Sequence, residues 1–203
     1  METTFTRRLR HRRRRAFVES YEFPAALSSK LREHFETEYE IQVALEGLRE
    51  WYLACLSAPG ESLGMPSRVV DIAWHEMILM TRAYHAFCER AFGYYLHHSP
   101  ESVMDEPLQH GLARTLAVLE GQSVGAAGVP LLFAIDGRLR PDEGFVGEEA
   151  DLGRLRSLQP HRWADYSPGL GSHGGGCGSG GGCGNGGGCG GGGCGGGGCG
   201  GGG

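Results

Sequence analysis

The residues best suited to chemistry are a carboxylate and an imidazole four positions apart, Asp71 and His75. They lie in a segment whose apolar residues recur at helical spacing, so both side chains fall on one helix face. A carboxylate beside an imidazole can fix its tautomer and raise its basicity, as happens in metal sites and at general bases. The pair therefore predicts a polar site that could hold a transition metal such as zinc.

Two further candidate metal ligands, His97 and His98, follow in the same segment. Along one continuous helix, His97 would lie about 33 Å from His75. These residues can share a site only if the chain folds back, for instance at Gly93. Any other ligand for a metal at His75 would have to come from a different helix, and the candidates there are Glu33, His34 and His110.

A structural interpretation of the same residues is also open. The four polar candidates would then be surface or buried hydrogen-bonding groups on a helix whose aromatic residues, including Trp74, form the core. The sequence has no H-E-x-x-H, no glycine-rich phosphate loop beside a strand and no C-x-x-C. The pattern G-x-S-x-G occurs at residues 60–64 and 121–125, but at both places it follows a predicted helix and not the strand that a nucleophilic serine of this motif requires. The sequence thus carries no positive signature of an enzyme.

The central segment resembles a known family. Its pattern D-x-x-W-H, then T-x-x-Y-x-x-F-C, then F-G-x-x-L-H-H-x-P is similar to that of the glycine-rich domain-containing protein-like family. The matching positions are Asp71, Trp74, His75, Thr81, Tyr84, Phe87, Cys88, Phe92, Gly93, Leu96, His97, His98 and Pro100. The resemblance covers residues 21–100 and is weaker beyond them. It implies no particular activity, but its pattern includes the polar Asp71 and His75, which favours a site there.

One helix is predicted to carry this segment, from Pro66, which suits a first helical position, to a stop at Gly93. Periodic apolar residues predict two helices, or one kinked helix, between Ala25 and Ser57. They also predict a helix from Leu108 to near Gly121 and a short one around Leu152–Leu158.

A small β-hairpin is predicted near the end of the body. Val129–Ile135 is a short apolar run, and Asp136-Gly137 is a two-residue turn signal before Arg138–Arg140. The expected fold is therefore mainly α, with one helical domain and a small C-terminal hairpin.

Composition divides the 203 residues into three parts: a disordered arginine-rich arm (1–15), a helical domain (16–168) and a disordered Gly/Cys-rich tail (169–203). The tail cysteines could be incidental to a spacer, capture a soft metal as thiolates, form intermolecular disulfides or be enzymatically modified. They are Cys177, Cys183, Cys189, Cys194 and Cys199. Cys55 and Cys88 lie on apolar faces and are expected to be buried thiols.

Charge is distributed unevenly. The arm holds seven of the nineteen basic residues, so the rest of the chain has a net charge of about −11. An acidic body argues against nucleic-acid binding by the folded domain. Contact with nucleic acid or an anionic surface is expected only through the arm, for which solvated charge is the simpler interpretation.

No apolar run approaches the ~20 residues that span a bilayer, and no signal-peptide core is present, so a cytoplasmic location is expected. One lysine against eighteen arginines indicates a GC-rich, bacterial genome. The leading functional prediction is a non-enzymatic binding or interaction module with a protein partner. The alternative is a metal-dependent enzyme or metal-binding protein centred on Asp71 and His75.

Overall fold

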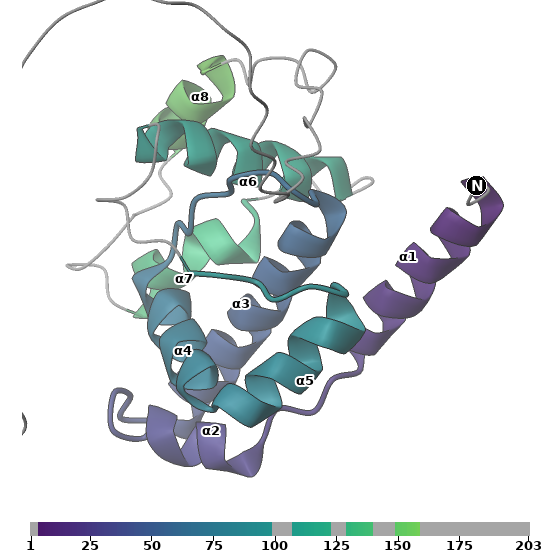
Figure 1. Ribbon diagram of the computed structural model, residues 1–203. Coiled ribbons are helices and arrows are strands. Elements are labelled where there is room, and N and C mark those ends of the chain that lie inside the picture. Colours follow the sequence, from purple (N-terminus) through teal and green to yellow (C-terminus); the bar gives the residue numbers. More distant parts are fainter. Residues whose placement is uncertain (1–3, 99–106, 123–128, 140–148, 159–203) are drawn as a thin grey trace, which may run out of the picture. The chain divides into compact units, whose positions relative to one another are not determined.

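The computed structural model describes residues 4–98, 107–122, 129–139 and 149–158 (Figure 1). Contacts divide the chain into two units, Met1–Pro168 and Gly169–Gly203. The second unit, with the five tail cysteines, lies outside the described residues. Within the described ranges the chain forms α-helices and no β-strand, which confirms the mainly helical fold. No helix there is both long and apolar enough to cross a membrane.

The long helix α3 (Glu38–Ser57) is the centre of the first unit, because it contacts α1 (Thr4–Glu19), α4 (Arg68–Leu79), α6 (Leu108–Gln122) and α7 (Leu131–Leu139). It begins with a reciprocal capping box between Thr37 and Glu40, which satisfies backbone N–H groups of its first turn. Helices α6 and α8 pack against each other (Figure 1). The helices are α1 (Thr4–Glu19), α2 (Ala25–Leu31), α3 (Glu38–Ser57), α4 (Arg68–Leu79), α5 (Thr81–Ala91), α6 (Leu108–Gln122), α7 (Leu131–Leu139) and α8 (Glu149–Ser157).

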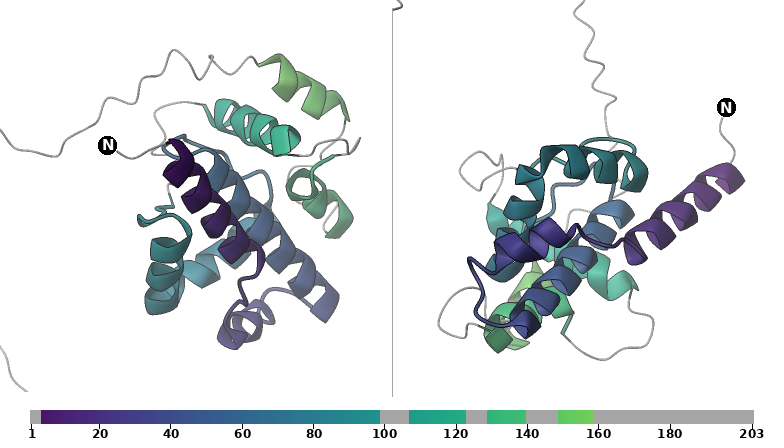
Figure 2. Two further views of the ribbon diagram at one scale, coloured as in Figure 1. Left: turned by 90° about the vertical axis from the view of Figure 1, so that its right-hand side faces the viewer. Right: turned by 90° about the horizontal axis from the view of Figure 1, so that it is seen from below.

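The arginine-rich arm is helical over residues 4–15, so the disorder predicted for that part is wrong. Only the C-terminal end of α1 packs on α3 and α5, and the rest projects away from them (Figures 1 and 2). Val18 is buried, and the guanidinium of Arg90 lies 4.3 Å from the Phe17 ring. Since arginine is a good helix former, a helix anchored at Phe17 continues towards the N-terminus.

The single helix predicted from residue 66 to Gly93 is in fact two, α4 and α5, which meet at Met80. Met80 has φ −78° and ψ 58°, which is not helical. No proline or glycine occurs between residues 67 and 92 to signal the break. The predicted stop at Gly93 is confirmed, because Gly93 has φ +78°, a conformation that glycine adopts without strain.

The predicted hairpin is also wrong, because Leu131–Leu139 forms helix α7. Two tertiary contacts override the turn signal. The Glu50 carboxylate of α3 accepts the backbone N–H of Leu132 at the start of α7. The Asp136 carboxylate, instead of forming a turn, accepts hydrogen bonds from the start of α4. The predicted helices between Ala25 and Ser57, and those over α6 and α8, are confirmed.

The connection between α3 and α4 lies against α6. Arg114 donates to the backbone carbonyl of Ser62 and Thr115 to that of Gly64. The approach is close at Gly64, where a Cβ would lie 2.7 Å from the backbone nitrogen of Leu112. Glycine at this position therefore lets the connection pack on α6.

Candidate metal centre

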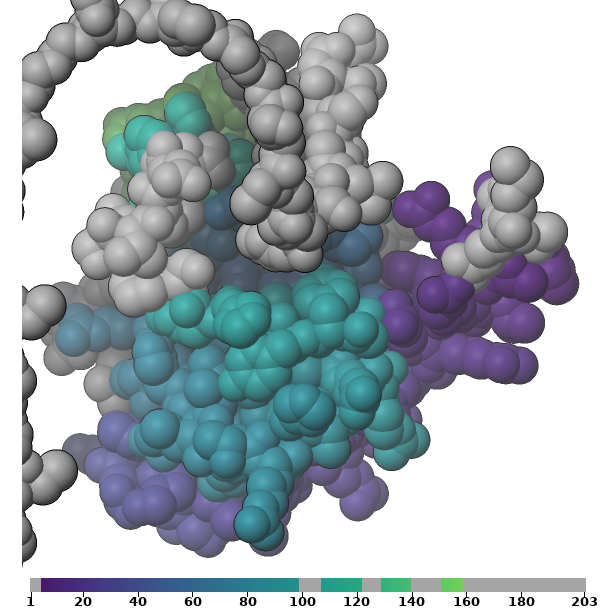
Figure 3. All heavy atoms as spheres, in the orientation of Figure 1, coloured from purple at the N-terminus to yellow at the C-terminus, as the bar shows by residue number. Residues whose placement is uncertain are grey.

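The chain reverses at Gly93, and the segment after it runs back past α4. Tyr94–His98 follows α5 and forms part of the surface on the face seen in Figure 3 (teal). His98 thereby reaches Asp71 on α4, although 27 residues separate them. The chain therefore does fold back as a shared site requires, and the histidine that it brings to Asp71 and His75 is His98 and not His97.

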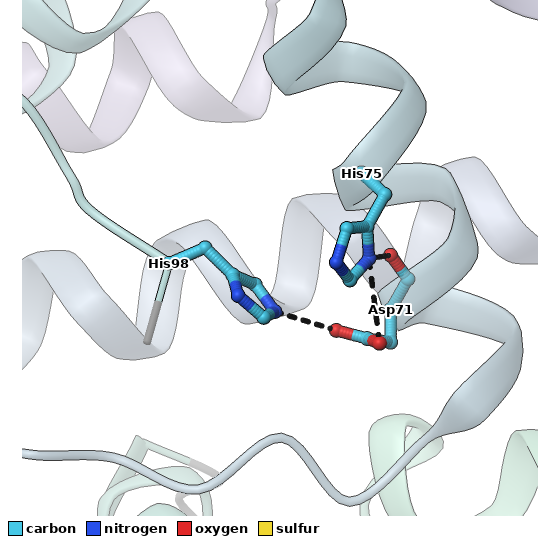
Figure 4. A group of neighbouring side chains, drawn as sticks. All are labelled: Asp71, His75 and His98. Atoms are coloured by element: carbon cyan, nitrogen blue, oxygen red, sulfur yellow. Dashed lines mark hydrogen bonds and ion pairs between the residues drawn. The ribbon is translucent and has the colours of Figure 1, made fainter. Parts of the chain in front are cut away.

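Three side chains from these two segments meet: Asp71, His75 and His98 (Figure 4). Each offers one possible ligand atom, and these atoms all lie within 4.8 Å of one another. The carboxylate contacts both imidazoles, with Oδ1 3.1 Å from Nε2 of His98 and Oδ2 3.4 Å from Nδ1 of His75. The two imidazole centroids are 4.3 Å apart. The arrangement is a two-histidine, one-carboxylate cluster.

The hydrogen bonding of His75 fixes which of its nitrogens is free to bind a metal. Its Nδ1 lies 2.8 Å from the backbone carbonyl of Asp71. Because a carbonyl only accepts, Nδ1 must carry the hydrogen and donate it. The lone pair is then on Nε2, which lies on the side of His98 (Figure 4). Metal-binding histidines typically donate their other ring N–H to a carbonyl or carboxylate in this way.

One of the separations in the cluster is close to the spacing that one ion needs. Two ligands of a tetrahedral zinc, each bound at ~2.0 Å, lie about 3.3 Å apart. The separation between His98 Nε2 and Asp71 Oδ1 is 3.1 Å. Their side chains are 22% and 33% exposed, and that of His75 is 52% exposed, so solvent reaches the cluster.

Two linked hydrogen bonds, one buried and one partly buried, hold the returning segment against α4. The indole N–H of Trp74 donates to the Tyr84 hydroxyl at 3.0 Å, and that hydroxyl donates to the carbonyl of Leu96 at 2.6 Å. Burial raises the pKa of Tyr84, so its hydroxyl keeps the proton that it donates. The Trp74 ring also packs against the His98 ring, with centroids 4.8 Å apart. Trp74 therefore positions the histidine as well as filling the core.

A second network fixes the start of α4. The N-cap hydroxyl of Ser67 accepts from the backbone N–H of Val70 and donates to Asp136 Oδ1 at 2.6 Å. Asp136 also accepts the N–H groups of Arg68 and Val69, at 2.7 and 3.3 Å. A buried carboxylate from α7 thus caps the helix that carries Asp71 and His75.

The cluster forms part of the wall of a cavity of about 1170 Å³. Residues of α3, α4, α6 and α7, the connection before α4 and the segment after Gly93 line it. Much of the wall is aromatic, including Trp51, Trp74, Tyr94 and Tyr95. A volume of this size suits a small organic molecule.

The other candidate ligands do not join the cluster. His97 is exposed and packs at a tilt against Tyr95, with centroids 4.8 Å apart. His34 pairs with Glu76 at 3.0 Å, Glu33 pairs with Lys30, and His110 lies on α6 outside the cluster.

Both cysteines of the body are buried and free, as predicted. Burial raises the pKa of the Cys55 and Cys88 thiols, so both stay protonated at neutral pH and are poor metal ligands.

Two charged residues at the site are not predicted from the sequence. Arg68 lies three positions before Asp71 and shares its helix face, a spacing that could have been noticed. Asp136 was interpreted as a turn residue, and no local signal reveals that it caps a helix 68 residues upstream.

A family model described as UCP032817-like matches residues 13–153, a range that includes all three candidate ligands. No curated protein and no solved structure matches the chain. Since the matched residues make up more than half of the chain, it belongs to the UCP032817-like family.

Proposed function

We propose that this protein binds one divalent transition-metal ion, such as zinc, through Asp71, His75 and His98. The observation that carries the proposal is the convergence of three potential ligand atoms, from two separate segments, within 4.8 Å of one another. Two imidazoles and a carboxylate form a ligand set that zinc uses when it keeps an open coordination position. The same set also suits iron(II).

The surroundings support a functional ion. Three protein ligands leave at least one coordination position for water or another molecule. The cluster belongs to the wall of a large cavity, so a small molecule in the cavity could bind to the ion. An ion in this place would act as a Lewis acid or lower the pKa of a bound water. These features favour the metal-binding alternative over an interaction module without metal.

Alanine substitutions at the cluster test the proposal. The background is the full chain carrying Cys177→Ser, Cys183→Ser, Cys189→Ser, Cys194→Ser and Cys199→Ser, here called the serine-tail chain. In it, His98→Ala should weaken zinc binding by about 100-fold or more, since even changes in groups that only support a ligand cost 10–100-fold. Competition with a chromophoric chelator measures the affinity.

His97→Ala is the matched control, because His97 is the adjacent histidine, is exposed and lies outside the cluster. It should leave the zinc affinity unchanged. Equal affinities for the two variants would mean that zinc binds elsewhere and that Asp71 and His98 form only a structural hydrogen bond. Thermal unfolding of both variants shows whether they remain folded.

A further inference from the structure

Arg68 places a positive charge beside the candidate metal centre. It is the first residue of α4, and its spacing of three and seven positions from Asp71 and His75 puts all three on one helix face. All three also line the cavity. Along the helix axis, Arg68 is about 4.5 Å from Asp71, within the reach of a long side chain.

The Arg68 guanidinium is available to a ligand. The residue is exposed, and within the described parts of the chain its side chain forms no hydrogen bond or ion pair. The nearby Asp136 carboxylate is already engaged by Ser67 and two backbone N–H groups. Glu61 also lines the cavity, but it comes from the connection and not from α4. A guanidinium fork matches a carboxylate or phosphate group in geometry and charge.

The rest of the cavity wall favours a planar apolar body. Trp51 and Trp74 pack together with ring centroids 5.3 Å apart, and both line the cavity. The indole N–H of Trp51 is buried and has no hydrogen-bond partner within the described residues. Buried indole N–H groups usually find an acceptor, and an oxygen of a bound molecule would supply one.

We propose that the cavity binds a small aromatic anion, a carboxylate or phosphate, whose anionic group lies between the Arg68 guanidinium and the metal at Asp71, His75 and His98. The inference rests on the proposed metal binding. It assigns a class of ligand to the site: the anionic oxygens contact the metal and Arg68, and the ring contacts the aromatic wall. Aromatic molecules without the anionic group should bind more weakly than those that carry it.

Calorimetric titration of the zinc-loaded serine-tail chain tests this with three probes that share a naphthalene ring: 1-naphthoate, its neutral planar analogue 1-naphthamide, and 1-naphthylphosphonate. At least one anion should bind about tenfold or more tightly than the amide, since hydrogen bonds to charged groups are the strong ones. The two anions distinguish a carboxylate site from a phosphate site. Arg68→Gln should reduce this preference, because only the metal then contacts the anionic group, whereas Arg82→Gln, at an exposed arginine on α5 outside the cavity, should leave it unchanged.

Three outcomes overturn the inference: no probe binds at millimolar concentration, the amide binds as tightly as both anions, or Arg68→Gln leaves the anion preference undiminished. The same titrations on metal-free protein separate this inference from the proposed function. If zinc fails to bind but an Arg68-dependent anion site persists, the metal proposal fails and the anion site stands. If zinc binds and the anions show no preference, only the anion site is wrong.

Discussion

Replacing Trp74 with alanine is expected to lower the free energy of unfolding by about 3–5 kcal/mol, as truncation of a large core aromatic does. The side chain is 4% exposed and packs on Trp51. Its removal also leaves the Tyr84 hydroxyl without its donor. Chemical denaturation measures the loss. An unchanged transition would show that Trp74 is not part of the core.

The same substitution should weaken zinc binding in the fraction that stays folded, because Trp74 packs on His98 and anchors Tyr84. Trp74→Phe is the informative control. It keeps an aromatic ring in the core but cannot donate to Tyr84, so the expected loss of stability is smaller, about 1–2 kcal/mol. A phenylalanine variant as unstable as the alanine one would assign the effect to the hydrogen bond and not to packing.

Asp136→Ala is expected to cost about 3 kcal/mol, although Asp136 is far in sequence from α4. Its carboxylate is 1% exposed and accepts three hydrogen bonds at the start of that helix. Its removal leaves the buried Ser67 hydroxyl and the Val69 N–H without their acceptor, and each buried unsatisfied group costs about 1–3 kcal/mol.

Asp151→Ala serves as the comparison for Asp136→Ala, because Asp151 also lies on a helix, and among the described residues it makes only an exposed ion pair with Arg154. Its expected effect is within about 0.5 kcal/mol. Urea unfolding of both variants decides the matter. Equal stabilities would mean that Asp136 does not cap α4 and that another group fixes the helix start.

Much of the helical arrangement could be predicted because it depends on local periodicity. The spacing of apolar residues predicts the apolar faces of α3 and α6. A single glycine, Gly93, predicts where the helix stops. The break at Met80 could not be predicted, because the apolar positions before and after it continue the same helical period. The fold of α7 depends on Glu50, which is distant in sequence.

The candidate site, like the fold, could be predicted only where it depends on local spacing. Asp71 and His75 are neighbours on one helix, so their spacing alone brings them together. His98 joins them only because the returning segment is held by Trp74 and Tyr84, a tertiary contact that spacing does not encode. The sequence could not distinguish His98 from His97, because adjacent side chains of a non-helical segment point to opposite sides. Which of the two faces α4 depends on how the tertiary contact holds the segment.

The most direct test of the account is the metal content of the serine-tail chain after equilibrium dialysis against buffered zinc. We expect one zinc per chain, and none per chain for the Asp71→Ala, His98→Ala double variant, since no tail thiolates can contribute. Zinc absent from the parent chain, or equally present in the double variant, would contradict it. Asp71, His75 and His98 would then be a hydrogen-bonded structural cluster and not a metal centre.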